Sequence, residues 1–257
     1  MKKMTMSKTS KQNFITYAMV IVAYVIFQTL SATGNLSSLM QGLLVPLCTY
    51  SILAVSLNLT VGVLGELSLG HAGFMCIGAF SSAFFTACMK DTITNDLLRF
   101  ILAFIVAAVC AGICGILIGI PVLRLKGDYL AIVTLAFGEI IMNIINALYV
   151  GRDENGFHFS MKDSMSLNMS DSGKIIIKGA QGITGTARQS TFTIGIILLL
   201  LTLVVVLNLM NSRSGRAIMS IRDNRIAAES IGIDITKYKI MAFAISASLA
   251  GLAGCLY

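Results

Sequence analysis

Glycines and polar side chains cluster in one stretch of this sequence whose surroundings are apolar. Five glycines fall between residues 62 and 78, and Glu66, Ser68 and His71 lie among them. Glycines at this density weaken a continuous helix. A helix broken at membrane depth is tolerated where it lines a cavity, and its ends can then meet the charged groups of a solute. The pattern therefore predicts a polar route formed by Glu66, Ser68, Gly70, His71 and Gly73.

Simpler explanations remain open for two of these side chains. His71 can equally be a histidine that is hydrogen-bonded between packed helices, and Glu66 can be a carboxylate that water solvates at the membrane edge. Glu139 is the other charge inside an apolar run, where a charge is costly unless it is paired or wet. It faces either the route or a neighbouring helix. Thr134, five residues earlier, projects from a different part of the helix face, and we place both residues in the predicted route.

The composition indicates that lipid is the solvent for most of the surface. Of 257 residues, 56% are hydrophobic and 12% are charged, whereas soluble proteins carry about a quarter charged residues. A helix needs about 20 apolar residues to cross a bilayer, and continuous rather than alternating apolar runs exclude a transmembrane barrel. We expect a single all-α membrane domain, residues 1–257, with spans near 14–31, 42–60, 67–89, 98–123, 128–150, 191–211 and 239–257. Small residues spaced four apart, Gly115 with Gly119 and Ala250 with Gly254, predict close helix packing.

Basic residues give this bundle an orientation. Twelve of the nineteen Lys and Arg residues fall on the side of the N-terminus, which the positive-inside rule assigns to the cytoplasm. The polar segment 152–188 then faces outward and the segment 211–239 faces inward. The net charge of +7 reports this topology rather than nucleic-acid binding. The twelve are Lys2, Lys3, Lys8, Lys11, Arg124, Lys126, Arg213, Arg216, Arg222, Arg225, Lys237 and Lys239, and the other seven run from Lys90 to Arg188.

Several kinds of site have no signature in the sequence. The six cysteines lie in apolar runs without a C-x-x-C pair or a histidine cluster, so we interpret them as small hydrophobic residues rather than metal ligands. The basic N-terminus precedes an apolar run as in a signal peptide, but it lacks a small-residue cleavage site and is taken as a first helix. No G-x-x-x-x-G-K-[ST] sequence occurs, so energy for transport must come from another subunit or from an ion gradient.

Three blocks of sequence resemble one known family. They are LNLTVGVLGELSLGHAGFMCIGAF (57–80), GDYLAIVTLAFGEII (127–141) and the C-terminal SRSGRAIMSIRDNRIAAESIGIDITKYKIMAFAISASLAGLAGCLY (212–257). Together they are similar to the permeases of branched-chain amino-acid ABC transporters, in the order typical of that family. The sequence IRDNRIAAESIGI and the long outer segment look more like the M-type than the H-type permease of this family. Glu66 departs from the family, which more often has an amide there.

The resemblance assigns a role to the inward segment 211–239. ABC importers couple through a loop with the pattern E-A-A, three residues, then G; Ala227, Ala228 and Gly232 fit it, and Ile226 takes the acidic position. Small residues there would let a helix sink into a cleft on a partner, with ion pairs at the rim. The alternative is an amphipathic helix lying on lipid. The predicted coupling residues are Arg222, Asp223, Asn224, Ala227, Ala228, Glu229 and Gly232.

The resemblance also implies partners, cargo and place. The chain would pair with a second, similar permease, two cytoplasmic ATPases that carry ATP and Mg²⁺, and an external amino-acid-binding protein, all at a bacterial cytoplasmic membrane with the N-terminus inside. Its cargo would be leucine, isoleucine and valine, with sugars or nucleosides as the runner-up. An ion-coupled transporter and a structural anchor are less compatible with these motifs. The chain ends within an apolar run whereas family members continue, so we expect further spans in the intact protein.

The predicted topology can be tested by labelling single cysteines in a cysteine-free background. A cysteine near Lys174 should react with an impermeant reagent in intact cells, and a cysteine near Arg225 only after permeabilisation, because basic residues concentrate on the inner side. Labelling of the first site only after permeabilisation would overturn the orientation.

Overall fold

The computed structural model describes residues 8–90, 92–93, 95–125, 127–153, 156–162, 164–167, 174–183 and 189–257. Lys2, Lys3, Lys126 and Arg188, which entered the count of basic residues, lie outside these ranges. Within them, seven helices are long and apolar enough to cross a membrane, which is the predicted number. They are α1 (Lys8–Ala32), α2 (Ser38–Asn58), α3 (His71–Cys88), α4 (Asp96–Val122), α5 (Asp128–Ala147), α6 (Phe192–Asn211) and α9 (Ile235–Leu256).

Two of the predicted spans, the third and the fifth, extend three or more residues into segments that are not helical. The third was expected from residue 67, but α3 begins at His71 because residues 65–70 are not helical. The π-helical turn η1 (Leu59–Leu64) continues α2 up to that point. The fifth was expected to reach residue 150, but α5 ends at Ala147 and a strand follows.

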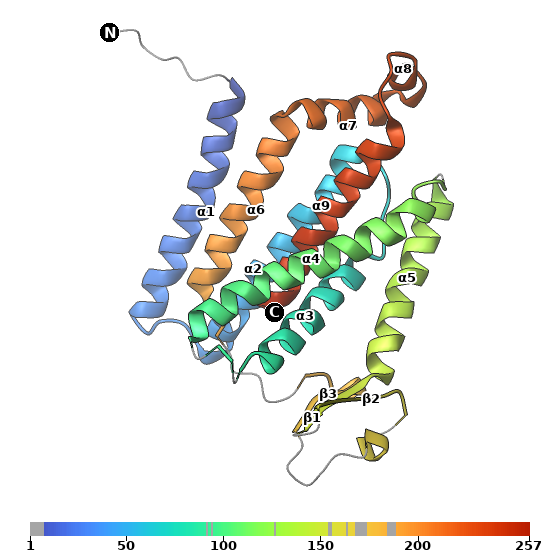
Figure 1. The fold of residues 1–257 in the computed structure, drawn as a ribbon. Helices are drawn as coiled ribbons and strands as arrows, with labels where there is room; N and C mark the ends of the chain where they lie inside the picture. The colour runs from blue at the N-terminus through green and yellow to red at the C-terminus, as the bar shows by residue number, and fades with distance from the viewer. Residues whose placement is uncertain are drawn as a thin grey trace.

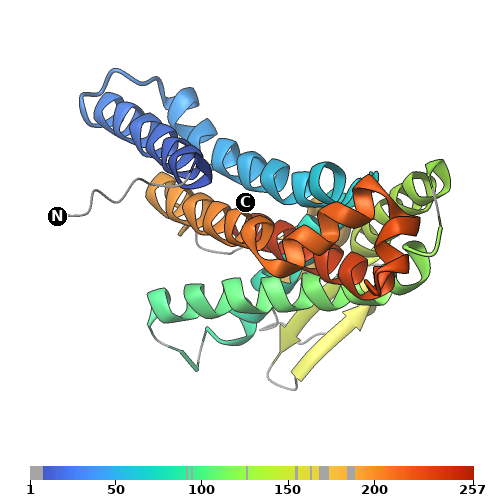
Figure 2. The same ribbon diagram turned by 90° about the horizontal axis from the view of Figure 1, so that it is seen from above.

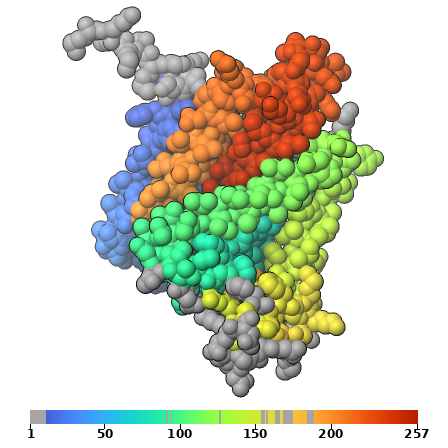
Figure 3. Space-filling model, in the orientation of Figure 1, coloured from blue at the N-terminus to red at the C-terminus, as the bar shows by residue number. Residues whose placement is uncertain are grey.

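The connections between helices gather at the two ends of the bundle. Two short helices, α7 (Arg213–Asp223) and α8 (Arg225–Ser230), lie at one end, and a three-stranded sheet lies at the other (Figure 1). In the view along the bundle, α1 with α2, then α6 with α9, then α4 form successive layers (Figure 2). The space-filling view shows α8 projecting beyond the bundle at the end opposite the sheet (Figure 3). The segments predicted to face inward and outward are thus on opposite sides.

Helix α9 forms the centre of the packing. Many of its residues are buried, whereas none of residues 11–32 of α1 is buried. Small side chains allow this close approach: a Cβ atom on Gly115 of α4 would lie 2.6 Å from the Cβ of Ala247, and one on Gly254 of α9 would collide with the backbone of Met75 in α3. Such contacts suit membrane helices, whose association depends on van der Waals packing. The two predicted small-residue motifs both lie in these interfaces.

The segment between α5 and α6 contains a small antiparallel sheet that the sequence analysis did not predict. Its strands are β1 (Tyr149–Asp153), β2 (Gly156–Ser160) and β3 (Lys174–Lys178), in the order β2-β1-β3, with 3₁₀ turns at Ser164–Leu167 and Gly179–Gln181. Val150, Ile176 and Ile177 pack against Phe80 and Phe84 at the end of α3. The sheet is therefore a cap fixed to the bundle.

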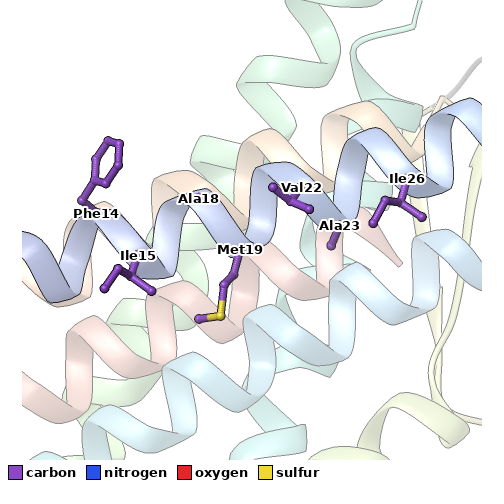
Figure 4. A pocket seen from close by; sticks show the side chains of 7 residues that line it. All are labelled: Phe14, Ile15, Ala18, Met19, Val22, Ala23 and Ile26. Atoms are coloured by element: carbon purple, nitrogen blue, oxygen red, sulfur yellow. The ribbon is translucent and has the colours of Figure 1, made fainter.

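Helix α1 lies at the edge and offers an apolar surface. Tyr24 joins it to α6 through a 3.1 Å hydrogen bond with Thr193 and a ring contact with Phe192. Its outer face carries an open, shallow groove without charged residues (Figure 4). Apolar exposure of this kind is expected where a helix meets hydrocarbon. The groove is lined by Phe14, Ile15, Ala18, Met19, Val22, Ala23 and Ile26.

The packing of α3 on α9 predicts that Gly78→Ala destabilises the protein. The added Cβ would lie 2.6 Å from the carbonyl carbon of Gly251, and overpacking of this kind costs about 1–3 kcal/mol. Gly42→Ala is the matched control, because a Cβ there meets nothing within 4 Å. Thermal unfolding in detergent should show a lower midpoint for Gly78→Ala only, and equal midpoints would contradict the packing.

Candidate functional site

The predicted break between the second and third spans is present as an extended segment. We call residues 65–70 the strap; it runs from the α7–α8 end of the bundle down to the start of α3 (Figure 1). Gly65 has φ of 80°, the left-handed conformation that commonly ends helices at glycine. The amide N–H groups of Gly65 and Glu66 both donate to the carbonyl of Thr60. Along the strap Ser68 and Gly70 are buried while Leu67 and Leu69 are exposed, the alternation of an extended chain.

The end of the strap nearest α7 is tied to the predicted coupling segment (residues 211–239) and to α9. The carboxylate of Glu66 forms an ion pair with the ammonium of Lys239, whose side chain is 5% exposed. Arg222 of α7 donates from Nη1 to the carbonyl of Gly62 at 2.9 Å. Sequence reasoning counted Lys239 only as a topology signal and missed the pair. Both residues are isolated charges at ends of apolar runs, a signal that could have suggested it.

The other end of the strap is fixed to α5. Thr134 Oγ1 accepts a hydrogen bond from the Leu69 amide at 3.1 Å and donates to the Ala131 carbonyl at 2.9 Å. Gly70 packs so closely on the Thr134 backbone that no Cβ would fit, and a Cβ on Gly73 would lie in tight contact, 3.2 Å from Gly138 Cα. These two glycines therefore serve the contact between α3 and α5. Thr134 thus provides a hydrogen-bond acceptor for the Leu69 amide, which lies outside any helix.

The simpler explanation of His71 matches the observed geometry. Its Nε2 lies 2.8 Å from Ser56 Oγ of α2, and its ring meets Phe74 edge-on. Only 5% of the residue is exposed. Ser68 is buried as well, and its hydroxyl finds no hydrogen-bond partner within the described part of the chain.

Glu139 stands apart from the other predicted route residues. Glu66, Ser68, Gly70, His71, Gly73 and Thr134 belong to the strap and its immediate packing, whereas Glu139 is exposed on α5. Thr134, five residues earlier, is buried against the strap. The two residues thus lie on different parts of the helix, as their spacing predicted.

The predicted coupling segment, residues 211–239, contains two short helices where one was expected. Asn224 separates them, and its Oδ1 accepts from the Ala227 amide at 3.1 Å, which caps α8. Asp223 accepts two hydrogen bonds from Arg222, at 3.1 and 3.0 Å. Gly232, with φ of 84°, follows the end of α8 as predicted.

The expectation that Ala228 offers a small side chain to a partner is wrong. It is 2% exposed and packs against Ile221 and Ile235 inside the chain. The exposed side chains are instead Ile226, which is 81% exposed, and Ile231, which is 75% exposed. Ala227 and Glu229 are also exposed. Two large aliphatic residues at the tip of a membrane bundle mark a surface suited to a protein partner.

Comparison with known proteins places these features in one family. The family model for the permease component of branched-chain amino acid transport systems matches residues 39–257, which include the strap, α5 and the coupling segment. The chain belongs to this family. This membership and the seven apolar helices show a multi-pass inner-membrane protein, as the resemblance of its motifs indicated.

Two curated proteins are similar along most of the chain. Both are described as the high-affinity branched-chain amino acid transport system permease protein LivM, one from Salmonella typhimurium and one from Escherichia coli. Each is 32% identical over 217 residues, covering 81% of this chain and 49% of the relative. The chain thus spans about half the length of these relatives. No solved structure matches significantly.

The hydrogen bond between Thr134 and the strap predicts that Thr134→Val lowers stability. Valine keeps the shape of threonine but leaves the partly buried Leu69 amide without its acceptor, at a cost of about 1–3 kcal/mol. Thr134→Ser should keep most of the wild-type stability, because serine retains the hydroxyl group. Thr202→Val is the control, since Thr202 is buried but donates only within its own helix, to Leu198. Equal unfolding midpoints for Thr134→Val and Thr202→Val would show that the contact contributes nothing.

Proposed function

We propose that this chain is the membrane-spanning permease of an ATP-driven importer for leucine, isoleucine and valine. The observation that carries the proposal is the family match over residues 39–257, which contains both the broken span and the coupling segment. The names of the two relatives give branched-chain amino acids as their cargo. The exposed Ile226 and Ile231 at the tip of α8 favour an external energy source, because such a surface suits a protein partner.

The partners follow from this assignment. A second, similar permease completes the route, two ATPases hydrolyse ATP with Mg²⁺ on the cytoplasmic side, and an amino-acid-binding protein delivers cargo from outside. This chain itself binds neither nucleotide nor metal in the proposed mechanism. The N-terminus, α7 and α8 face the cytoplasm, where the ATPases lie, and the sheet faces the binding protein.

The docking surface consists of Ile226 and Ile231 surrounded by charge. Apolar residues at the centre with polar residues at the rim are the usual anatomy of a protein interface. Ala227 and Glu229 are also exposed on α8, and the exposed carboxylate of Asp223 adds charge at the border of this surface. Asn224, Ala228 and Gly232 shape the segment from within, by capping α8, filling the space beneath it and ending it.

The route for the amino acid runs beside the strap and α5. Glu139 supports this placement: a carboxylate exposed midway along an apolar helix requires water or a partner, and a wet route between the two permeases supplies water. Its charge attracts the ammonium group of an amino acid. The strap, with Ser68 and the tightly packed Gly70, Gly73 and His71 behind it, forms the adjoining wall, and Glu66 holds its inner end.

Reconstitution tests the function as a whole. The full-length protein is assembled in proteoliposomes with its permease, ATPase and binding-protein partners. These proteoliposomes should accumulate radiolabelled leucine only when ATP is present on the side of the membrane where the ATPases lie. Excess unlabelled isoleucine or valine should compete, and a sugar or nucleoside should not. Leucine uptake driven by an ion gradient without ATP would refute the proposal.

The docking surface predicts that Ile226→Asp removes the ATPases from the complex. An aspartate at the apolar centre of the contact would be buried without a partner, so ATPase co-purification and leucine uptake should both fall about tenfold or more, as for a central interface residue. The permease alone should keep its unfolding midpoint, because the side chain is exposed.

Two further variants separate docking from folding. Ile226→Val keeps an apolar side chain and should retain binding. Ala228→Arg should instead lower the unfolding midpoint, since Ala228 packs inside the chain. Normal ATPase binding by Ile226→Asp would exclude this surface.

A further inference from the structure

We propose that Arg222 and the Glu66–Lys239 ion pair are positioning residues that transmit movement of the coupling segment to the strap. This inference rests on the proposed function, in which partner ATPases move α7 and α8. It adds a physical path by which that movement reaches the broken span. Three contacts carry it, and all three converge on η1 and the first residues of the strap.

The first contact is made by Arg222 over the end of the second span. Its guanidinium is held on one side by Asp223 and donates on the other to the carbonyl of Gly62. The last carbonyls of a helix lack intrahelical donors, and a charged donor makes a stronger hydrogen bond than a neutral one. The bond therefore satisfies a group that the break creates.

Gly65 is shaped to receive the same side chain. A Cβ atom on Gly65 would lie 2.6 Å from Arg222 Cγ, and the residue has φ of 80°. Glycine is thus required twice at this position, by the backbone conformation and by the arginine that crosses it. The side chain of Arg222 and the turn into the strap fit as one unit.

The second contact is apolar. Leu59, Val63 and Leu64 of η1 share a buried cluster with Ile218 of α7 and Ala242 of α9. Packed interfaces shift between discrete arrangements rather than deform continuously. A displacement of α7 must therefore carry η1 with it or break the cluster.

The third contact is the ion pair between Glu66 and Lys239. The Lys239 side chain is 5% exposed and that of Glu66 is 16% exposed, so removing either partner would strand a charge in the protein. The pair obliges the inner end of the strap to follow the first turns of α9, which continue directly from the coupling segment. Because Thr134 holds the opposite end on α5, movement at the coupling segment strains the strap against a fixed point.

The test measures leucine transported per ATP hydrolysed in the reconstituted full complex. Arg222→Ala and Glu66→Lys should each lower this ratio about fivefold or more, the lower end of typical coupling between sites, while ATPase co-purification stays at the wild-type level. The matched controls are Arg216→Ala on the exposed side of α7, where the guanidinium contacts Asn211, and Lys237→Ala, which is exposed two residues before Lys239. Both should leave the ratio unchanged.

Charge reversal separates transmission from simple loss of packing. Glu66→Lys with Lys239→Glu restores the ion pair and should restore the ratio, whereas Lys239→Glu alone should not. Gly65→Ala, which acts on the other side of the Arg222 contact, should reproduce Arg222→Ala. The proposal would be overturned if Arg222→Ala and Glu66→Lys left the ratio of leucine transported to ATP hydrolysed unchanged per assembled complex, even if both variants were less stable. Failure of the unaltered protein to bind ATPases or to transport leucine would instead refute the proposed function.

Discussion

Backbone groups that leave a helix within hydrocarbon must find partners inside the protein, and this requirement organises the middle of the structure. The strap separates the second and third spans, and the N–H and C=O groups in it and just before it form hydrogen bonds with several elements. The Thr60 carbonyl accepts from two amides, the Thr134 hydroxyl of α5 accepts from one, and Arg222 of α7 donates to the Gly62 carbonyl. The break therefore fixes where α5 and α7 lie relative to α2 and α3.

The helices and the break were predictable because both depend on local sequence. Charge-free runs of about 20 residues mark spans, and the glycines between residues 62 and 78 mark the place where a helix fails. The sheet after α5 was not predicted: its three strands have five residues each and lie in a polar segment, so they leave no long periodic pattern. Their stability depends on packing against Phe80 and Phe84, which precede them by many residues.

The contacts of the candidate site were harder to predict than its residues. Glu66, His71 and Thr134 were identified from their types, but Glu66 pairs with Lys239 across 173 positions, and no local pattern joins them. His71 was left between two explanations, and its contact with Ser56 fits the packed one. Helix α8 has six residues, too few for a periodicity that tells which side faces inward, so the exposure of Ile226 and the burial of Ala228 were not predicted.

The composition of α9 has a consequence for how this protein can change over time. Half of its twelve buried residues are Ala or Gly, among them Ala242, Ala247, Ala250 and Gly254, and these side chains leave almost nothing to remove. At those positions nearly every substitution enlarges a side chain where neighbouring atoms already touch. We therefore expect tolerated substitutions to fall mainly on lipid-facing positions, where Leu, Ile and Val can replace one another, rather than in the contacts among α3, α4 and α9.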